Sequence, residues 1–366
     1  MLLRDYGRVQ QYEKAIRVIM IKKNNKNKYM ATCVPGAEEI LKDEISILIP
    51  EKNTLYFERG KVFFRSDLGL DDLLKLRCAD NIYRVLNRFR IGQHKKDLSN
   101  FHKNISQTDD HDLFGDTGNK RIIVSASRSG RHTYSRYDLS DTAMEALLAT
   151  NQFEMGDEKN HDFAFRIDVK DEICLFSVQL TPAEFRFRKE NFYSSKGGIR
   201  PSVAHCLVRV SEPKNHDVFY DPFCGAGTIV HERSSYKYKK IFASDIDPEI
   251  LDIARQNLGN GIILFQADAV CTKIKNNSID TVVTNMPWGS QIQVADLPEL
   301  YYCFIKELKR ILKENGKAVI LTDQDQLLRE SCDEWGFILT FPFELSLHGL
   351  HPKIFILTRK INNMNI

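Results

Sequence analysis

Asp221-Pro-Phe-Cys-Gly-Ala-Gly-Thr228 is the stretch of sequence that decides the fold. It directly follows a short β-favouring run, Asp217-Val-Phe-Tyr220, and it opens an apolar helical segment. Its glycines, Gly225 and Gly227, let the chain turn sharply at the end of a strand and bring bare backbone close to a ligand. Asp245 lies 20 residues beyond Gly225, at the end of the next predicted strand, where its carboxylate can accept hydrogen bonds from two ribose hydroxyls. The spacing therefore predicts a nucleotide-type binding turn.

Two further predicted strands also lead into polar residues. The run 262–265 leads into Asp268, and the run 281–284 leads into Asn285-Met-Pro-Trp288. In an open α/β sheet, ligands bind outside the carboxyl ends of the strands, so four such ends favour a shared site over four ordinary turns. The turn departs from the dinucleotide pattern, because Val230 stands where a third glycine would be. We expect an α/β domain with one ligand site.

The loop at 221–228 resembles the S-adenosylmethionine loop of class I methyltransferases, and 285–288 resembles the Asn-x-Pro-aromatic motif of amino-methyltransferases in that class. The resemblance implies a Rossmann-like domain with a seven-stranded sheet and an antiparallel last strand. It also implies S-adenosyl-L-methionine as the cofactor. Asp221 and the two glycines would surround its methionine part, Asp245 would bind its ribose, and Asp268 would lie near its adenine amine. The cofactor-binding positions that we expect are Ser202, Asp221, Cys224, Gly225, Gly227, Thr228, Asp245, Ile246, Asp268, Ala269 and Asn285.

The segment 285–288 has the residue types that an amine-methylating site needs, and its four residues are the expected catalytic set. An exocyclic amine on a base is a poor nucleophile, since its lone pair is delocalised into the ring. Acceptors around its N–H bonds would favour a more tetrahedral nitrogen and stabilise the developing positive charge. The side-chain oxygen of Asn285 and the backbone carbonyl of Met286 suit that role. Pro287 stiffens the loop, and Trp288 offers a face for a flipped base.

The rest of the chain predicts further modules before the methyltransferase domain. Strand and helix patterns after Tyr29 follow the order β-α-β-β-α-β, which predicts a ferredoxin-like α+β module. The predicted division is an unassigned N-terminal extension (1–28), the ferredoxin-like module (29–90), a THUMP RNA-binding domain (91–181), a basic and aromatic linker (182–200) and the methyltransferase domain (201–366). Residues 91–120 are polar and are expected to form a helix-poor connection or a partly ordered insert. Ser202 is expected to cap the helix that precedes the cofactor loop and still face the cofactor.

The resemblance to a THUMP domain, a module of several tRNA-modifying enzymes, depends on Ser127-Arg-Ser-Gly130, His132, Ser135-Arg136 and two closing strands. In the linker, basic side chains alternate with aromatic ones, so cations could neutralise phosphates while aromatic faces stack on unpaired bases. The aromatics could equally pack between domains. The RNA-binding residues that we expect are Arg128, Arg131, Arg136, Arg186, Arg188 and Lys196.

Composition excludes several other classes of protein. The 366 residues are 42% apolar and 28% charged, which is ordinary for a globular chain long enough for two or three domains. The eight cysteines include no Cys-x-x-Cys pair, which argues against a zinc ribbon or redox motif and fits reduced cytosolic thiols. We expect no metal, since His348 and His351 lie in a glycine- and proline-containing turn. No run approaches 18 apolar residues, and the first twenty do not form a signal peptide, so a cytoplasmic protein is expected.

The combined resemblance, from about Tyr29 onward, is to tRNA guanosine-N2 methyltransferases that modify position 6, and a similar architecture occurs in rRNA guanine-N2 enzymes. We therefore expect an RNA guanine-N2 methyltransferase that acts on tRNA, with rRNA as the alternative substrate. The Asn-x-Pro-aromatic motif also serves DNA-adenine and protein-glutamine methyltransferases, and a non-catalytic RNA-binding protein is a further alternative. A pyrimidine-C5 enzyme would need a cysteine nucleophile where Trp288 stands. The oligomeric state stays open.

Overall fold

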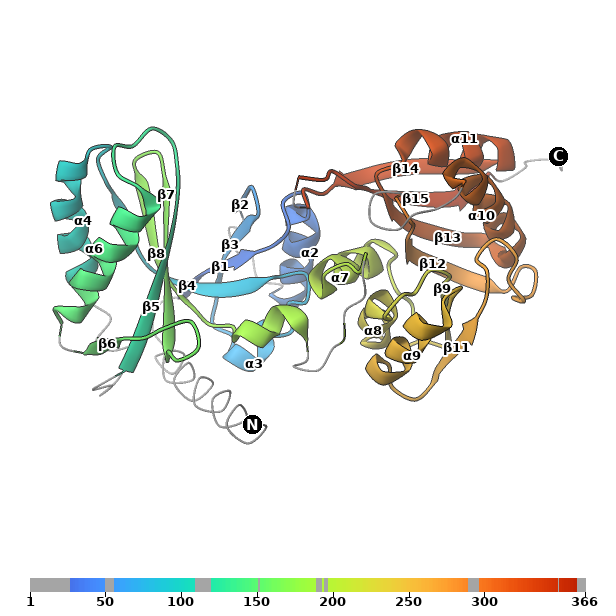
Figure 1. Cartoon of the computed structure of the whole chain (residues 1–366), viewed down its shortest axis with the longest axis horizontal. Coiled ribbons are helices and arrows are strands. Elements are labelled where there is room, and N and C mark those ends of the chain that lie inside the picture. Colours follow the sequence, from blue (N-terminus) through green and yellow to red (C-terminus); the bar gives the residue numbers. More distant parts are fainter. Residues whose placement is uncertain are drawn as a thin grey trace.

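The computed structural model describes residues 27–49, 56–108, 120–150, 152–188, 193, 197–288, 296–347 and 349–360. It has two sheets toward opposite ends of an elongated molecule, with helices α2 and α7 between them (Figure 1). One sheet has eight strands in the order β2-β3-β1-β4-β8-β7-β5-β6, and the other has seven in the order β11-β10-β9-β12-β13-β15-β14. None of the helices in these ranges is both long enough and apolar enough to span a bilayer. Almost all of the predicted N-terminal extension lies outside the described residues.

The first half of the eight-stranded sheet has the predicted order of elements. Its strands pair as β2-β3-β1-β4, so the chain returns to place β4 beside β1, as in a ferredoxin-like arrangement. Gly60, with a φ of 71°, makes the turn of the hairpin between β2 and β3. The elements are β1 (Asn27–Thr32), α2 (Glu38–Leu48), β2 (Tyr56–Glu58), β3 (Lys61–Ser66), α3 (Leu70–Leu73) and β4 (Asn81–Arg90).

The second half of that sheet continues from β4, which pairs antiparallel with β8 from Tyr83↔Gln179 to Arg90↔Ile173. Its elements are a 3-10 turn η1 (Lys95–Asp97), α4 (Leu98–Ser106), β5 (Lys120–Ser129), α6 (Arg136–Leu148), β6 (Phe153–Met155), β7 (Phe163–Lys170) and β8 (Ile173–Gln179). The expectation of a helix-poor connection over 91–120 is wrong, because α4 lies within it. Phe101 and Ile105 lie four residues apart on one face of α4 and are buried, although the other residues of the helix are mostly polar.

The seven-stranded sheet confirms the predicted methyltransferase-like topology. β15 is antiparallel to both of its neighbours, β13 and β14, while β9 to β13 are parallel. The elements are a 3-10 turn η2 (Ala183–Phe187), α7 (Pro201–Val210), β9 (Val218–Asp221), α8 (Thr228–Ser234), β10 (Lys240–Asp245), α9 (Pro248–Asn257), β11 (Ile262–Gln266), β12 (Ile279–Asn285), α10 (Leu297–Ile311), β13 (Leu312–Thr322), α11 (Asp325–Trp335), β14 (Phe337–Glu344) and β15 (Lys353–Arg359).

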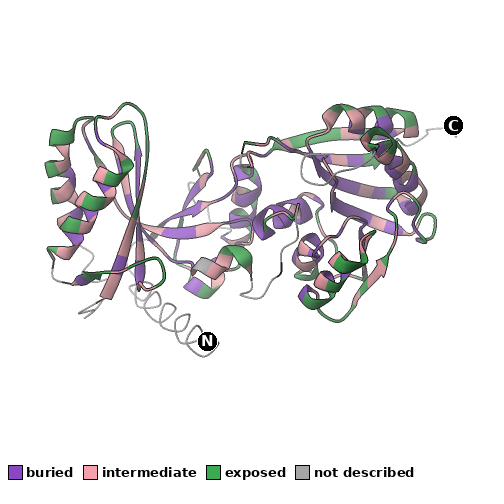
Figure 2. Ribbon diagram, in the orientation of Figure 1, coloured by how far each residue is buried: buried purple, intermediate pink, exposed green. Residues whose placement is uncertain are grey.

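Alternate residues of the central strands enter two separate cores. Phe219 and Val283 belong to a core that includes α7 and α8 and continues into the N-terminal sheet, whereas Tyr220 and Val282 face α10 and α11. Every residue of α7 from Pro201 to Val208 is buried, as expected for a helix covered on all sides (Figure 2). Helix α7 is therefore the central contact between the two halves of the molecule.

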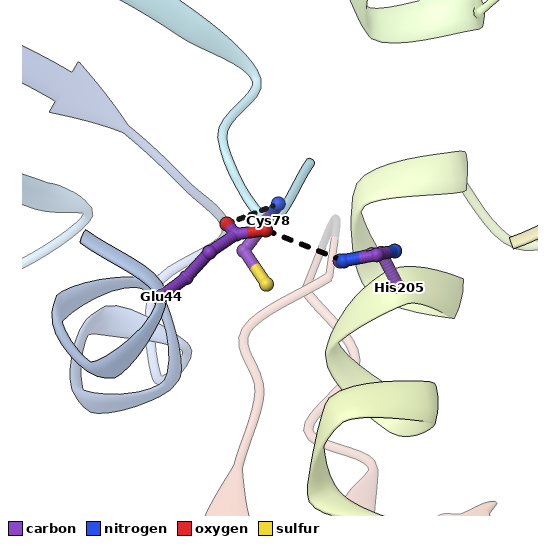
Figure 3. A group of neighbouring side chains, drawn as sticks. All are labelled: Glu44, Cys78 and His205. Atoms are coloured by element: carbon purple, nitrogen blue, oxygen red, sulfur yellow. Dashed lines mark hydrogen bonds and ion pairs between the residues drawn. The ribbon is translucent and has the colours of Figure 1, made fainter. Parts of the chain in front are cut away.

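A buried polar group lies at this contact, formed by Glu44 of α2, Cys78 and His205 of α7 (Figure 3). Each offers a potential metal-ligand atom, and these atoms lie within 4.8 Å of one another. They already have partners within the protein: the backbone N–H groups of Arg77 and Cys78 donate to Glu44 at 3.0 and 2.9 Å, and His205 Nδ1 lies 2.8 Å from Glu232 Oε2. These hydrogen bonds are those of a structural junction between the two halves.

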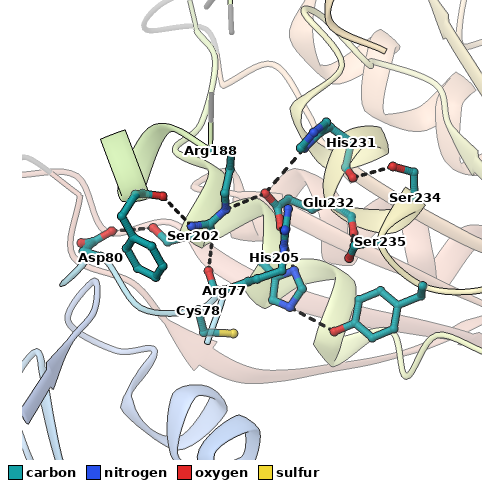
Figure 4. A network of polar contacts seen from close by, with 12 residues as sticks. Arg77, Cys78, Asp80, Arg188, Ser202, His205, His231, Glu232, Ser234 and Ser235 are labelled. Atoms are coloured by element: carbon teal, nitrogen blue, oxygen red, sulfur yellow. Dashed lines mark hydrogen bonds and ion pairs between the residues drawn. The ribbon is translucent and has the colours of Figure 1, made fainter. Parts of the chain in front are cut away.

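Glu232 of α8 extends this junction to the linker (Figure 4). Its carboxylate is fully buried and accepts from Arg77 Nε at 2.7 Å and Arg188 Nε at 3.0 Å. The Arg188 guanidinium also donates to the carbonyl oxygens of Phe185 and Arg77. Two arginines and two histidines, His205 and His231, therefore surround a single carboxylate, which draws together the N-terminal half, the linker and the methyltransferase domain.

Candidate active site

The parallel register brings the predicted polar residues to one edge of the seven-stranded sheet. Asp221 is aligned with Ala243 of β10, two residues before Asp245, and Tyr220 is aligned with Val282 of β12. Because these strands are parallel neighbours, their carboxyl ends meet at the same edge. Asp221, Asp245 and Asn285 therefore lie on three adjacent strands, as the sequence predicts.

Asp221 is a buried carboxylate with one unused oxygen. Its Oδ1 accepts from the Thr284 hydroxyl at 2.7 Å and from the Phe223 N–H at 3.3 Å, whereas no described residue donates to its buried Oδ2. Burial raises the pKa of the Asp221 carboxyl to about 7, and the charge of Asp245 adds to the rise. A cationic group placed beside Oδ2 would satisfy this oxygen and favour the ionised carboxylate.

Asp245 holds the glycine turn in place. Its Oδ2 accepts from the Gly225 N–H at 2.9 Å and its Oδ1 from the Asp247 N–H at 3.1 Å. Each carboxylate oxygen has two lone pairs, so both keep capacity for ligand hydroxyls. Gly227 has a φ of 87°, and a Cβ there would lie 3.0 Å from Leu258, so only glycine fits without strain.

The other predicted cofactor positions divide into packing residues and exposed residues. Cys224 is buried, its N–H donates to Ser244 O at 2.9 Å, and burial raises the pKa of its thiol, as expected for a small packing residue. Thr228 begins α8, and Ala269 is buried. The side chain of Ile246 is 63% exposed at the end of β10, where an apolar side chain has no packing reason to face solvent.

Asp268, which is exposed, follows β11 and accepts the N–H of Val270 at 3.1 Å. Ser202 differs from the prediction: the predicted cap is wrong, because α7 already begins at Pro201 and its N-cap is Arg200. The Ser202 hydroxyl instead donates to Asp80 Oδ1 at 2.6 Å, across the contact between the two halves (Figure 4).

The segment 285–288 lines a pocket of about 200 Å³ beside the sheet edge. The Asn285 amide donates to Gly197 O at 3.4 Å, while its buried Oδ1 has no hydrogen-bond partner among the residues that the structure describes. The Met286 N–H and the Trp288 indole N–H both donate to Leu321 O, and Pro287 O accepts from the Tyr301 hydroxyl at 3.1 Å. The loop is therefore fixed by neighbouring strands and helices, which leaves the Asn285 oxygen free for a ligand.

The rest of the pocket lining consists of residues that the sequence pattern did not predict. Gly197 to Arg200 form one part, and Leu347 and Leu350 of the β14–β15 connection form another. In the sequence, the two leucines on either side of His348-Gly349 resemble an ordinary turn. Only the structure shows that they line the same pocket as Asn285.

Comparison with known proteins is consistent with this geometry. Residues 188–338 match the model of the family described as UPF0020, RMKL-like, methyltransferase domain. The chain is 28% identical over 340 residues to the tRNA (guanine(6)-N2)-methyltransferase of Thermus thermophilus, covering 90% of this chain and 98% of that one. It is 22% identical over 389 residues to the protein of the same name from Methanocaldococcus jannaschii, covering 90% and 99%. The crystal structure of TrmN from Thermus thermophilus has a TM-score of 0.78 at 26% identity, covering 91% of this chain and 100% of that one.

Residues 188–338 form a methyltransferase domain.

The cofactor of this methyltransferase domain is S-adenosylmethionine, and the residues present fit it. Asp221 offers an unpartnered carboxylate oxygen to a cation, Asp245 offers acceptors to a ribose, and the exposed Ile246 offers an apolar surface to a base. The structure of SMU.472 complexed with SAH has the same fold, with a TM-score of 0.72 at 16% identity over 92% of this chain and 99% of that one.

Outside the methyltransferase domain, the predicted RNA-binding arginines of the turn after β5 are exposed. Among the described residues, Arg128 and Arg131 have no ion-pair partner, and Arg136 stacks over the exposed ring of Tyr137 at 4.8 Å. Lys196 lies outside the described residues. Because these three arginines are exposed, a polyanion could reach their guanidinium groups.

In the linker, the two predicted arginines differ. Arg186 is exposed and stacks over the ring of Phe187 at 4.7 Å, and that ring is 52% exposed. The side chain of Arg188 is only 6% exposed and is paired with Glu232, so the prediction that it contacts RNA is corrected. Arg188 belongs to the buried junction.

Proposed function

We propose that this protein transfers a methyl group from S-adenosylmethionine to the exocyclic N2 amine of a guanine in tRNA. The observation that carries the proposal is the buried Oδ1 of Asn285, to which no residue in the described ranges donates, and which lies in a pocket at the end of the strand beside Asp221. A buried acceptor without a partner is costly unless a ligand donates to it, and an exocyclic amine is such a donor. The names of the relatives with 22–28% identity over nine-tenths of this chain support the choice of guanine N2 and of tRNA.

The proposed step needs little beyond alignment and hydrogen bonding. When bound, S-adenosylmethionine supplies an electrophilic methyl group on a sulfonium: the bond from carbon to sulfur breaks, the bond from N2 to carbon forms, and one amine proton leaves to solvent. Asn285 Oδ1 would accept an N–H of the amine and stabilise the positive charge that develops on nitrogen. Pro287 fixes the direction of the loop, and Trp288 provides a face against which the base is held in line.

We also propose that the exposed arginines of the N-terminal half and the linker hold the RNA. Arg128, Arg131 and Arg136 lie around one turn, and Arg186 stacks on Phe187 in the segment that leads to the methyltransferase domain. Their charges would neutralise phosphates, while Phe187 offers a stacking surface for an unpaired base.

The test is methyl transfer from labelled S-adenosylmethionine to unmodified tRNA and rRNA, followed by nucleoside analysis. N2-methylguanosine in the tRNA fraction supports the proposal, and N2-methylguanosine in rRNA alone would change the substrate but keep the reaction. A methylated adenosine would overturn the choice of base. No incorporation into either RNA, with the cofactor bound, would overturn the function.

Asn285→Ala is the first variant to test in this assay. It removes the unpartnered oxygen without affecting Asp221 or Asp245, so we expect the methylation rate to fall by about 10²- to 10³-fold. Cofactor affinity, measured by calorimetry, should stay within about two- to threefold of the wild-type value. An equal loss of cofactor affinity would contradict the role given to Asn285.

A further inference from the structure

The connection between β14 and β15 forms a small apolar tip beside the proposed catalytic residues. The Leu347 N–H donates to Leu350 O and the Leu350 N–H donates to Leu347 O, both at 2.9 Å, so the two leucines close a tight turn. Both side chains are partly exposed and line the same pocket as Asn285 and Trp288. We call residues 345–347 and 349–350 the hairpin tip.

The hairpin tip is held by the N-terminal half of the molecule. The Ser346 N–H donates to Pro35 O at 2.8 Å, and the Arg59 guanidinium donates to the Ser346 hydroxyl at 3.3 Å. Leu345, the first residue of the tip, is fully buried. The hairpin tip, which lines the pocket of the methyltransferase domain, is therefore hydrogen-bonded to two turns of the N-terminal half. One turn follows β1 and contains Pro35, and the other joins β2 to β3 and contains Arg59.

Gly36 makes this contact unusually close. Its φ is 100°, and a Cβ at this position would lie 1.9 Å from Glu344 O and 3.1 Å from Leu345 Cα. No residue other than glycine fits at this position unless the backbone of the tip moves. The turn at Pro35-Gly36 therefore fixes how near the tip lies to the N-terminal half.

We propose that Leu347 and Leu350 form the apolar wall that orients the target base, and that the contact of Gly36 with Glu344 sets the position of this wall. A flipped base is read by hydrogen bonds at its edge and by side chains against its faces. Asn285 provides the edge contact, and the leucines provide an apolar face in the lining of the same pocket. The inference rests on the proposed function, and it assigns the N-terminal half a part in alignment as well as in RNA binding.

The first test truncates the wall with Leu347→Ala and Leu350→Ala, singly and together. We expect kcat/KM for RNA methylation to fall by about 10- to 100-fold, because a base misplaced by about 1 Å loses alignment with the methyl group. Cofactor affinity and RNA affinity should stay at their wild-type values. Leu347→Met and Leu350→Met, which retain apolar bulk, should recover most of the activity.

The second test moves the wall without changing any residue that lines the pocket. Gly36→Ala should displace the tip and lower kcat by about tenfold or more, with the KM for RNA little changed. Gly60→Ala is the matched control: it also places a side chain at positive φ in an adjacent turn, but its Cβ would meet Cys33 O and Pro35 at 3.3 and 3.4 Å instead of the tip. The control should keep its kcat.

The outcomes separate the two proposals. If the wild-type protein methylates RNA but the alanine variants of Leu347 and Leu350 keep wild-type kcat/KM, the wall is overturned and the proposed function stands. If those variants lose activity but Gly36→Ala behaves like Gly60→Ala, the positioning role of Gly36 is overturned. If the wild-type protein methylates no RNA, the proposed function fails and the inference fails with it.

Discussion

At the scale of single residues, the site has acceptors that the protein itself does not satisfy. Within the part of the chain that the structure describes, Asp221 and Asn285 each keep one buried oxygen without a partner, although neighbouring groups hold the rest of each side chain in place. Sequence patterns predicted both residues, because aspartate and asparagine at the ends of buried strands have no packing purpose. The free oxygen on each could not be predicted, since it depends on which neighbours reach the other atoms.

The raised pKa of Asp221 leads to a prediction about pH. In the cofactor-free protein this carboxyl ionises near pH 7, and a bound cation requires the ionised form. Cofactor affinity should therefore rise by up to about tenfold per pH unit as pH increases toward 7, and level off above it. In Asp221→Asn, affinity at pH 8 should be lower and nearly independent of pH, as titration calorimetry between pH 5.5 and 8.5 would show.

Stability provides the control for this prediction. A carboxyl whose pKa is raised in the folded state stabilises the fold below its unfolded pKa, and this contribution is lost as pH rises through the folded value. The cofactor-free protein should therefore lose stability between about pH 4 and pH 7 relative to Asp221→Asn, whose amide can still accept from Thr284 and Phe223. A variant that is less stable than the wild type at pH 8 would contradict the raised pKa.

At the scale of elements, the sequence predicted the strands that form the site well, because β9, β10 and β12 each end in an aspartate or asparagine that interrupts an apolar run. It did not predict α4, because only Phe101 and Ile105 mark its buried face among polar neighbours. The sequence did not predict the hairpin tip for another reason. The tip that carries Leu347 and Leu350 contacts Pro35-Gly36, about 310 positions earlier in the chain, and such a long-range contact cannot be predicted from local sequence.

The linker turn η2 gives a matched pair of variants for RNA binding. Arg186 and Arg188 are indistinguishable in sequence, yet one is exposed and the other is buried against Glu232. Arg186→Ala should reduce the slope of log affinity against log salt by about 0.7 to 1, with an unchanged unfolding temperature. Arg188→Ala should lower the unfolding temperature instead. Fluorescence anisotropy at several salt concentrations and thermal unfolding would measure the two effects, and equal salt slopes for the wild type and Arg186→Ala would rule out a phosphate contact.

At the scale of the whole molecule, the buried junction around Glu232 joins the two halves. Burial alone would raise the pKa of Glu232, but hydrogen bonds from His205 and His231 and the charges of Arg188 and Arg77 hold it well below its usual value. The stability that this provides is present above the unfolded pKa of about 4.5 and is lost as pH falls.

Glu232→Gln should lower the free energy of unfolding by about 3–5 kcal/mol at pH 7, because it leaves the buried arginine without a counter-charge. The difference from the wild type should shrink as pH falls below about 4.5, because the unfolded wild-type chain then takes up a proton that the folded carboxylate does not. Denaturant unfolding at pH 7 and at pH values well below 4.5 would measure this change. A difference that is the same at all of these pH values would show that the charge of Glu232 does not hold the halves together.

The pairing of β4 with β8 has a consequence for anyone who wishes to exchange RNA specificity between enzymes of this kind. Because β4 is hydrogen-bonded to β1 along one edge and to β8 along the other, a cut near residue 90 would expose strand edges on both pieces and invite aggregation. A transplant must therefore carry residues 27–181 as one cassette. The cassette must also keep Gly36 and Arg59, because these residues contact the hairpin tip of the recipient and hold it in position. Without them, a grafted enzyme that bound its new RNA could still fail to methylate it.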